Sequence, residues 1–223
     1  MRHRTLALLL LVVGLLPVAG SYVHAAPAPK PPSALPKLSL WETALLGRWV
    51  AIDGYVNKYT RRYKIPARWT TMAFASESVL NPLAKGSEPG DRGIGQVGFY
   101  TEKWTRAQAT DPTHPNYNPD VTKHASIWNP QVNIALASIS FNWVYTRPDV
   151  KSPADAYAVY TVGIHAINPD GSYVPKAQER VDRARGFRKL LASFSRLKRA
   201  AKGMSQTKLE AAIPDPLVRT ILG

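Results

Sequence analysis

Apolar side chains recur every three or four positions over most of the chain, which is the pattern of helices that bury one face. The clearest run starts at Trp41 and continues through Leu45, Trp49, Ile52, Val56, Tyr59 and Tyr63. No stretch alternates convincingly between apolar and polar residues, as a half-buried strand would. The pattern therefore predicts a mainly α-helical fold.

Proline and cap residues divide the rest of the chain into further helices. Pro66 suits the first turn of a second helix, which ends at Asn81-Pro82. Asn129-Pro130 and Ser152-Pro153 each join an N-cap residue to a proline that suits the first turn. These pairs predict helices that run to Arg147 and Gly163, and a last helix is expected over about 175 to 199.

The periodicity also predicts which side chains these helices bury. In the second helix Trp69, Met72 and Ala73 point inward, and the helix after Asn129 buries Val132, Leu136, Ile139 and Trp143. Between these two helices lie a glycine-rich stretch from Gly86 to Gly98 and a polar segment from Asp111 to Asp120. We expect the polar segment to be a long surface loop.

The first forty residues have the composition of an export signal followed by a spacer. Arg2 and Arg4 precede an apolar run over 6–18, which is shorter than the roughly 20 residues of a membrane span. We expect cleavage before Ala26. The predicted organisation is a signal peptide at 1–25, a proline-rich flexible linker at 26–39, one domain at 40–200 and a C-terminal tail at 201–223. The protein is then exported, periplasmic or extracellular, and associated with the cell wall.

Charge and composition narrow the choice of partners. Lys and Arg number 29 against 15 Asp and Glu, a formal charge of +14, which favours an anionic partner. Outside the cytoplasm, cell-wall polymer and membrane surface are more accessible than nucleic acid. The chain has no cysteine, which excludes disulfides, thiolate metal sites and a cysteine nucleophile. Its histidines show no metal-binding spacing, so we expect neither metal nor cofactor.

Glu77 is the strongest candidate for a catalytic side chain. It follows an apolar helical segment that contains Trp69, Met72 and Phe74, and burial raises the pKa of a carboxyl group. A carboxyl group with a raised pKa can act as a general acid near neutral pH. A lone glutamate near a helix end is more often a surface or capping group, so the assignment depends on the motifs that follow it.

Four short motifs, in this order, resemble those of the soluble lytic transglycosylases, which have the goose-type lysozyme fold. They are Glu77-Ser78 with Asn81-Pro82, then Ser87-x-x-Gly90-x-x-Gly93-Ile94-Gly95-Gln96, then Asn133-Ile134 with Ala137, and last Val159-Tyr160-Thr161-Val162-Gly163. Each motif alone is weak, whereas four in order over about 55 to 190 make a specific resemblance. It implies a lysozyme-like single domain of about six helices with a catalytic groove.

The resemblance also implies a function and the residues that perform it. The expected activity is cleavage of the β-1,4 bond between N-acetylmuramic acid and N-acetylglucosamine, leaving a 1,6-anhydromuramic acid end, with Glu77 as the single general acid and base. Tyr160 is implied to hydrogen-bond this glutamate, and Ser87 and Gln96 to bind the adjacent N-acetyl and hydroxyl groups. The glycan strands of peptidoglycan are the expected partner of a monomeric enzyme.

Further contacts with the wall are less closely defined by the sequence. Sugar rings could stack on any of several aromatic residues, among them Tyr100, Trp104, Tyr117 and Tyr173. The basic residues of the last helix are most often a solvated face, and in an exported protein they are also candidates for contact with anionic wall or membrane. They are Arg180, Arg183, Arg185, Arg188, Lys189, Arg196, Lys198 and Arg199.

Two other functions remain open at the level of the sequence. A hydrolytic lysozyme or chitinase-like glycosidase on the same fold would leave a reducing end instead of the anhydro product. A non-catalytic cell-wall-binding module would keep the fold without the reaction. The presence of Glu77 at the motif position argues against the second of these alternatives.

Overall fold

The structure is a computed structural model that describes residues 38–86 and 90–201. The predicted signal peptide, nearly all of the linker and nearly all of the C-terminal tail lie outside these residues. Within them the chain forms α1 (Leu40–Arg62), α2 (Ala67–Ser78), α3 (Phe99–Thr110), α4 (Pro130–Tyr145), α5 (Pro153–Val162) and α6 (Pro175–Ala201). The mainly α-helical fold is confirmed, since the described residues pair as strands only at isolated β-bridges.

The helices begin where the cap residues predict. The side chain of Asn129 accepts hydrogen bonds from the backbone N–H groups of Gln131 and Val132 at the start of α4. Ser152 caps α5 in the same way through the N–H of Asp155. These side chains satisfy N–H groups that have no partner inside the helix, so the sequence fixes both starting points locally.

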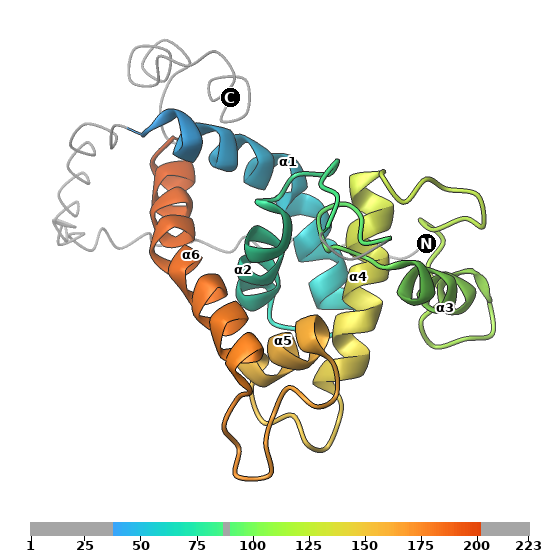
Figure 1. The fold of residues 1–223 in the computed structure, drawn as a ribbon. Coiled ribbons are helices and arrows are strands. Elements are labelled where there is room, and N and C mark those ends of the chain that lie inside the picture. The colour runs from blue at the N-terminus through green and yellow to red at the C-terminus, as the bar shows by residue number, and fades with distance from the viewer. Residues whose placement is uncertain (1–37, 87–89, 202–223) are drawn as a thin grey trace, which may run out of the picture. The chain divides into compact units, whose positions relative to one another are not determined.

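Two helices form the centre of the fold. Figure 1 shows α2 in the middle, and it packs against α1, α5 and α6. Helix α4 packs against α1, α3 and α5, and every residue over 132–141 is buried. The sequence predicts one buried stripe on this helix, but neighbours on several sides bury it all round. None of the helices in the described ranges is both long and apolar enough to cross a membrane.

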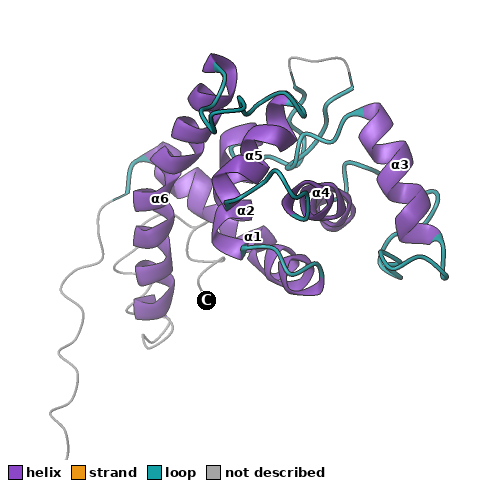
Figure 2. Ribbon diagram, turned by 90° about the horizontal axis from the view of Figure 1, so that it is seen from below, coloured by secondary structure: helices purple, strands orange, loops and turns teal. Residues whose placement is uncertain are grey.

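Helix α3 is the element that the hydrophobic pattern does not predict. It buries only Thr105 and Ala109, so no apolar stripe marks it in the sequence. It lies beside α4, on the side away from α2 and α6 (Figures 1 and 2). The predicted burial of Trp143 on α4 is wrong for a related reason, because this side chain is 47% exposed next to α3.

Candidate active site

Glu77 lies in the last turn of α2, one residue before the helix ends at Ser78. The next two residues, Val79 and Leu80, have left-handed backbone conformations with φ of 52° and 55°, which are uncommon outside glycine. The surrounding structure holds this turn, because Leu80 is fully buried and Arg48 donates a hydrogen bond to the carbonyl of Val79. The chain thereby turns sharply away from Glu77 and into the glycine-rich loop.

Burial raises the pKa of Glu77 above its usual value. The side chain is only 11% exposed, and loss of solvation disfavours the carboxylate. Its place at the carboxyl end of α2 acts in the same direction, because unpaired carbonyl groups there repel a negative charge. A hydrogen bond from Tyr157 and the charges of Arg180 and Arg183 oppose this shift, but the net pKa is raised. The pKa shift predicted from the sequence is confirmed.

The hydrogen bond to Glu77 comes from Tyr157, not from Tyr160. The phenol of Tyr157 donates to Oε1 of Glu77 over 2.6 Å. Tyr160 instead donates to the carbonyl of Gly95, also over 2.6 Å. The implied bond between Tyr160 and the glutamate is therefore wrong, because the carbonyl of Gly95 accepts the bond from Tyr160 and the phenol of Tyr157, three residues earlier on α5, takes the place beside Oε1.

Tyr157 is suited to be a permanent donor. Burial, and next the negative charge of Glu77, raise the pKa of its phenol far above the ordinary value. The phenol therefore stays protonated around neutral pH. It fixes the position of Oε1, while the other carboxyl oxygen of Glu77 makes no hydrogen bond among the described residues.

The glycine-rich loop is fastened to three helices. Ser78 at the end of α2 donates a hydrogen bond to the carbonyl of Ile94 over 2.8 Å, as well as to Phe74 in its own helix. The N–H of Gly95 donates to Oδ1 of Asn133 on α4 over 2.8 Å. With the bond from Tyr160, these contacts hold the loop backbone beside Glu77.

Only glycine fits at position 95. A Cβ atom there would lie 2.4 Å from the Cβ of Ala137 on α4, well inside contact distance. The side-chain amide of Asn133 also donates to the carbonyl of Arg92 over 2.9 Å. Asn133 and Ala137 of the third motif therefore hold the backbone of the loop in place.

A cavity of about 180 Å³ opens beside Glu77. It takes its lining from α2, the glycine-rich loop, α3, α4 and α5. The lining residues are Glu77, Asp91, Gln96, Gly98, Thr101, Ser140, Tyr160 and Thr161. Two of them carry carboxyl groups, and the negative charge of Asp91 adds to the rise in the pKa of Glu77.

The structure brings most of the residues predicted from the sequence together. Glu77, Gln96 and Tyr160 line the same cavity, while Ser87 lies outside the described residues. The side-chain amide of Gln96 donates to the carbonyl of Gly93 over 2.7 Å, so it also stabilises the loop. Sequence reasoning missed the hydrogen bond from Tyr157 to Glu77.

Thr101, Ser140 and Thr161 also line the cavity. Of these three, Thr161 belongs to the fourth motif. No local signal marks the other two, because Thr101 comes from the unpredicted helix α3 and Ser140 follows the third motif by several residues. Only the packing of α3 against α4 brings them to the cavity.

Arg180 is not part of a purely solvated face. Its Nη1 lies 3.9 Å from Oε1 of Glu77, and its side chain is 25% exposed. This separation is at the limit of an ion pair and leaves room for the closer contact with Tyr157. The prediction of a solvated basic face therefore fails for this residue of α6, which places a positive charge beside the cavity.

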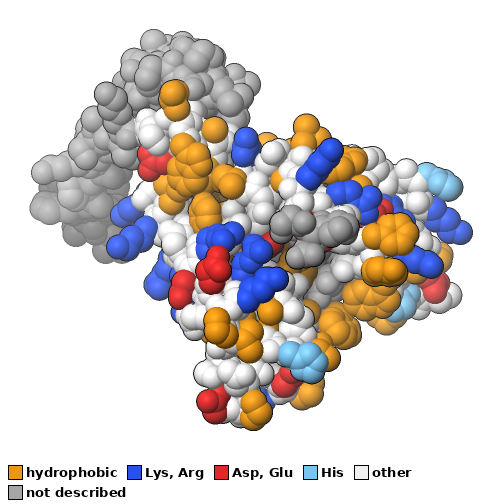
Figure 3. Space-filling model, viewed as in Figure 1, with side chains coloured by type: hydrophobic (Ala, Val, Ile, Leu, Met, Phe, Trp, Pro, Cys, Tyr) orange, Lys and Arg blue, Asp and Glu red, His pale blue; other side chains and the backbone are white. Residues whose placement is uncertain are grey.

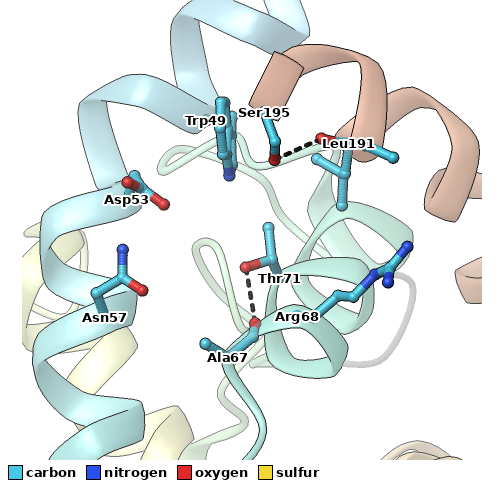
Figure 4. A pocket seen from close by; sticks show the side chains of 9 residues that line it. Trp49, Asp53, Asn57, Ala67, Arg68, Thr71, Leu191 and Ser195 are labelled. Carbon is cyan, nitrogen blue, oxygen red and sulfur yellow. Dashed lines mark hydrogen bonds between the residues drawn. The ribbon is translucent and has the colours of Figure 1, made fainter. Parts of the chain in front are cut away.

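A second hollow lies on another side of α2, between α1 and α6. Figure 4 shows Trp49, Asp53 and Asn57 of α1 facing Arg68 and Thr71 of α2 across it. Its volume is about 240 Å³. Asp53 is engaged there by Lys198 of α6, with Nζ and Oδ2 separated by 2.8 Å.

Metal binding finds no support in the parts of the chain that the structure covers. No three acidic or histidine side chains gather there into a group that could hold an ion. The described residues that line the cavity carry carboxyl, phenol, hydroxyl and amide groups.

Comparison with known proteins gives one match. A family model described as "Transglycosylase SLT domain" matches residues 54–182, a range that contains Glu77, the glycine-rich loop and both tyrosines of α5. No curated protein and no solved structure matched the chain.

Proposed function

The chain belongs to the transglycosylase SLT domain family, and from this premise we propose that it is a peptidoglycan lytic transglycosylase with Glu77 as its only general acid and base. The family supports a lytic transglycosylase type of function and a peptidoglycan substrate in general terms. The proposal adds the bond that is cut, the 1,6-anhydro product and the role of each residue.

In the first step Glu77 is the acid. Its carboxyl group protonates the oxygen that bridges N-acetylmuramic acid to N-acetylglucosamine, and the C1–O bond breaks. The positive charge that develops at C1 is stabilised by the carbonyl oxygen of the substrate's own N-acetyl group. The raised pKa of Glu77 supports this role, because it keeps the acid form populated toward neutral pH.

In the second step Glu77 is the base. As a carboxylate it takes the proton from the C6 hydroxyl of the same sugar while that oxygen bonds to C1. The ring closes as a 1,6-anhydro sugar, Glu77 is protonated again, and no water is consumed. Tyr157 and Arg180 support this step, since a phenol at 2.6 Å and a guanidinium at 3.9 Å both favour the carboxylate.

The observation that carries the proposal is the environment of Glu77. A carboxyl group only 11% exposed borders a polar cavity, beside a loop that three helices hold in place. Such a group can change its protonation state within a fixed geometry, which is what acid and base catalysis by one residue needs.

One observation favours a second candidate function. Asp91 lines the same cavity as Glu77, and glycosidases that hydrolyse their substrate commonly use a pair of carboxyl groups. In a hydrolase Asp91 would activate a water molecule or stabilise the charge at C1. The product would then carry a reducing end.

One digestion experiment distinguishes the lytic transglycosylase from the hydrolase. Purified peptidoglycan is incubated with the wild-type protein in water labelled with heavy oxygen, and the released fragments are analysed by mass spectrometry. The proposal expects fragments with 1,6-anhydromuramic acid ends that contain no label, and no fragments from Glu77→Gln.

Each other outcome contradicts the proposal in a recognisable way. Labelled reducing ends would establish hydrolysis, and loss of that activity in Asp91→Asn would assign the second carboxyl group. Binding to wall without any released fragment from the wild-type protein would favour a non-catalytic module.

The function requires export, which we propose from the sequence of the first 25 residues. Expression of the full chain with a C-terminal tag is expected to yield an exported protein whose mass corresponds to a first residue at Ala26. Recovery of the uncleaved chain from the cytoplasm alone would contradict this part of the proposal.

A further inference from the structure

Two tryptophan rings stand side by side on the surface of α3 and α4. Trp104 is 38% exposed and Trp143 is 47% exposed, and their ring centroids lie 5.6 Å apart at an angle of 74°. Hydrophobic side chains gather on this part of the surface, over α3 (Figure 3). Large aromatic rings that stay exposed as a cluster commonly mark a binding surface.

The tryptophan pair continues the wall of the Glu77 cavity. Thr101 of α3 and Ser140 of α4 line that cavity, and Trp104 and Trp143 each follow three residues later on the same helix. Residues three apart lie next to each other on a helix surface. A ligand that leaves the cavity between α3 and α4 therefore meets the two indole rings within one helical turn.

The pair is held in position before any ligand arrives. The guanidinium of Arg147 lies over the ring of Trp143, 5.5 Å from its centroid. Asp149 in turn accepts two hydrogen bonds from Arg147, over 3.0 Å and 2.9 Å. Rings ordered in advance lose little conformational entropy on binding, and Arg147 and Asp149 add polar groups at the edge of the aromatic surface.

The size of the cavity shows that a polymer must extend beyond it. Its volume of about 180 Å³ is below the roughly 300 to 1,000 Å³ of pockets that enclose a small-molecule ligand. A glycan strand therefore lies mostly outside the cavity. Sugar rings present an apolar C–H face and polar hydroxyl edges, which match an indole face with charged groups beside it.

We infer that Trp104 and Trp143 form a stacking subsite that binds the glycan strand one helical turn away from the cavity of Glu77. The inference rests on the proposed function, because the bound ligand is the strand that Glu77 cleaves. The subsite holds long strands in register and contributes little to the binding of fragments that end inside the cavity.

The test measures binding separately from cleavage. Glu77→Gln serves as background, so that strands stay intact, and the ligands are peptide-free glycan strands and disaccharides from purified peptidoglycan. Adding Trp104→Ala or Trp143→Ala is expected to lower the ratio of long-strand to disaccharide affinity about tenfold. Trp143→Phe keeps an aromatic face and is expected to lower it no more than about threefold.

Trp41→Ala is the matched control. Trp41 is 52% exposed and also pairs with an aromatic ring, that of Phe187 of α6 at 6.3 Å, but it lies on α1 and does not line the cavity. Its replacement is expected to leave the affinity ratio unchanged. An unchanged ratio in both Trp104→Ala and Trp143→Ala, or an equal fall in Trp41→Ala, overturns the inference.

The outcome is independent of the reaction that Glu77 performs. Loss of long-strand binding in the two variants, together with a wild-type protein that releases no fragment, keeps the subsite and removes the proposed activity. Anhydro products together with an unchanged affinity ratio would support the proposed activity and contradict the subsite. Thermal unfolding of each variant checks that truncating these exposed rings leaves the fold intact.

Discussion

Helix α6 places a basic side chain beside each of two carboxyl groups, and the two contacts differ in kind. Lys198 lies 2.8 Å from Asp53, which lines the hollow of Figure 4, so two full charges meet directly. Arg180 stays 3.9 Å from Glu77, and the closer partner of that carboxyl is the neutral phenol of Tyr157 at 2.6 Å. The first contact joins α6 to α1, whereas the second leaves a buried acid without a full counter-charge in direct contact.

Volume does not single out the cavity beside Glu77 from the hollow around Asp53. The hollow around Asp53 is the larger, at about 240 Å³ against about 180 Å³, and it contains an aromatic ring, an acid and an amide. What differs is the nearest partner of each acid, which is the ammonium of Lys198 at 2.8 Å for Asp53 and the phenol of Tyr157 at 2.6 Å for Glu77. In this protein the nearest partner of a carboxyl group is therefore a better guide to its role than the volume of the hollow beside it.

The largest expected effect separates these two acids directly. Glu77→Gln removes the group that gives and takes the proton, and turnover of peptidoglycan should fall by roughly two to four orders of magnitude. Asp53→Asn has the same change in charge and size on the same protein. It should retain activity close to that of the wild type, as measured by release of soluble fragments. Comparable losses in both variants would contradict the distinction between the two regions.

The next prediction tests which tyrosine donates the hydrogen bond to Glu77. Tyr157→Phe removes the hydrogen bond to Glu77, so kcat is expected to fall about tenfold. This bond lowers the pKa of Glu77, so its loss raises that pKa and moves the alkaline limb of the pH–rate profile to higher pH. Tyr160→Phe removes a bond to the carbonyl of Gly95 instead. Its alkaline limb should stay in place, and a shift in this variant alone would reverse the assignment.

The two tyrosines also show how far the sequence predicts the site. Cap residues and apolar spacing predict the ends and the buried faces of most helices, because these depend on neighbours within a few positions. The motif places the helix that carries Tyr157 and Tyr160 near Glu77. Which of the two faces the carboxyl depends on how α5 is rotated against α2 and the loop, and nothing local to α5 records that rotation.

Trp143 illustrates the same limit on the opposite side of the cavity. Its spacing matches the buried stripe of α4, but the helix ends at Tyr145 and the last turn emerges beside α3. Helix α3 itself has too few apolar residues to be predicted. The sequence therefore points to Glu77 and the loop beside it. The side of the cavity that α3 and α4 form cannot be predicted until the two helices are packed together.

A smaller effect is expected from Arg180 and Lys198, the basic residues of α6 that lie beside Glu77 and Asp53. Arg180→Gln removes a charge that lowers the pKa of Glu77, so the alkaline limb of the pH–rate profile should move to higher pH, by less than in Tyr157→Phe. The shift should shrink at high salt, because the side chain is partly exposed and screened. Lys198→Gln, which removes the partner of Asp53, should leave the profile unchanged. An equal shift in both variants would point to the overall charge of α6.

The smallest effect is on stability, and the two acids should differ in sign. The pKa of Glu77 is raised in the folded protein above its ordinary value of 4.5, so its protonated form contributes stability that is fully present below about pH 4.5 and is lost as pH rises through the folded pKa. Glutamine stays neutral, so the stability of Glu77→Gln relative to the wild type should increase over that range and then level off.

Asp53→Asn instead loses a partly exposed ion pair, at a cost of about 0.2 to 1 kcal/mol, and should be less stable than the wild type near neutral pH. Urea unfolding of both variants and the wild type across a pH series measures the two differences. If the free energy of unfolding of Glu77→Gln does not increase relative to the wild type as pH rises, burial of the charged carboxylate of Glu77 does not destabilise the protein. The contrast between Glu77 and Asp53 would then be contradicted, whatever the kinetic measurements show.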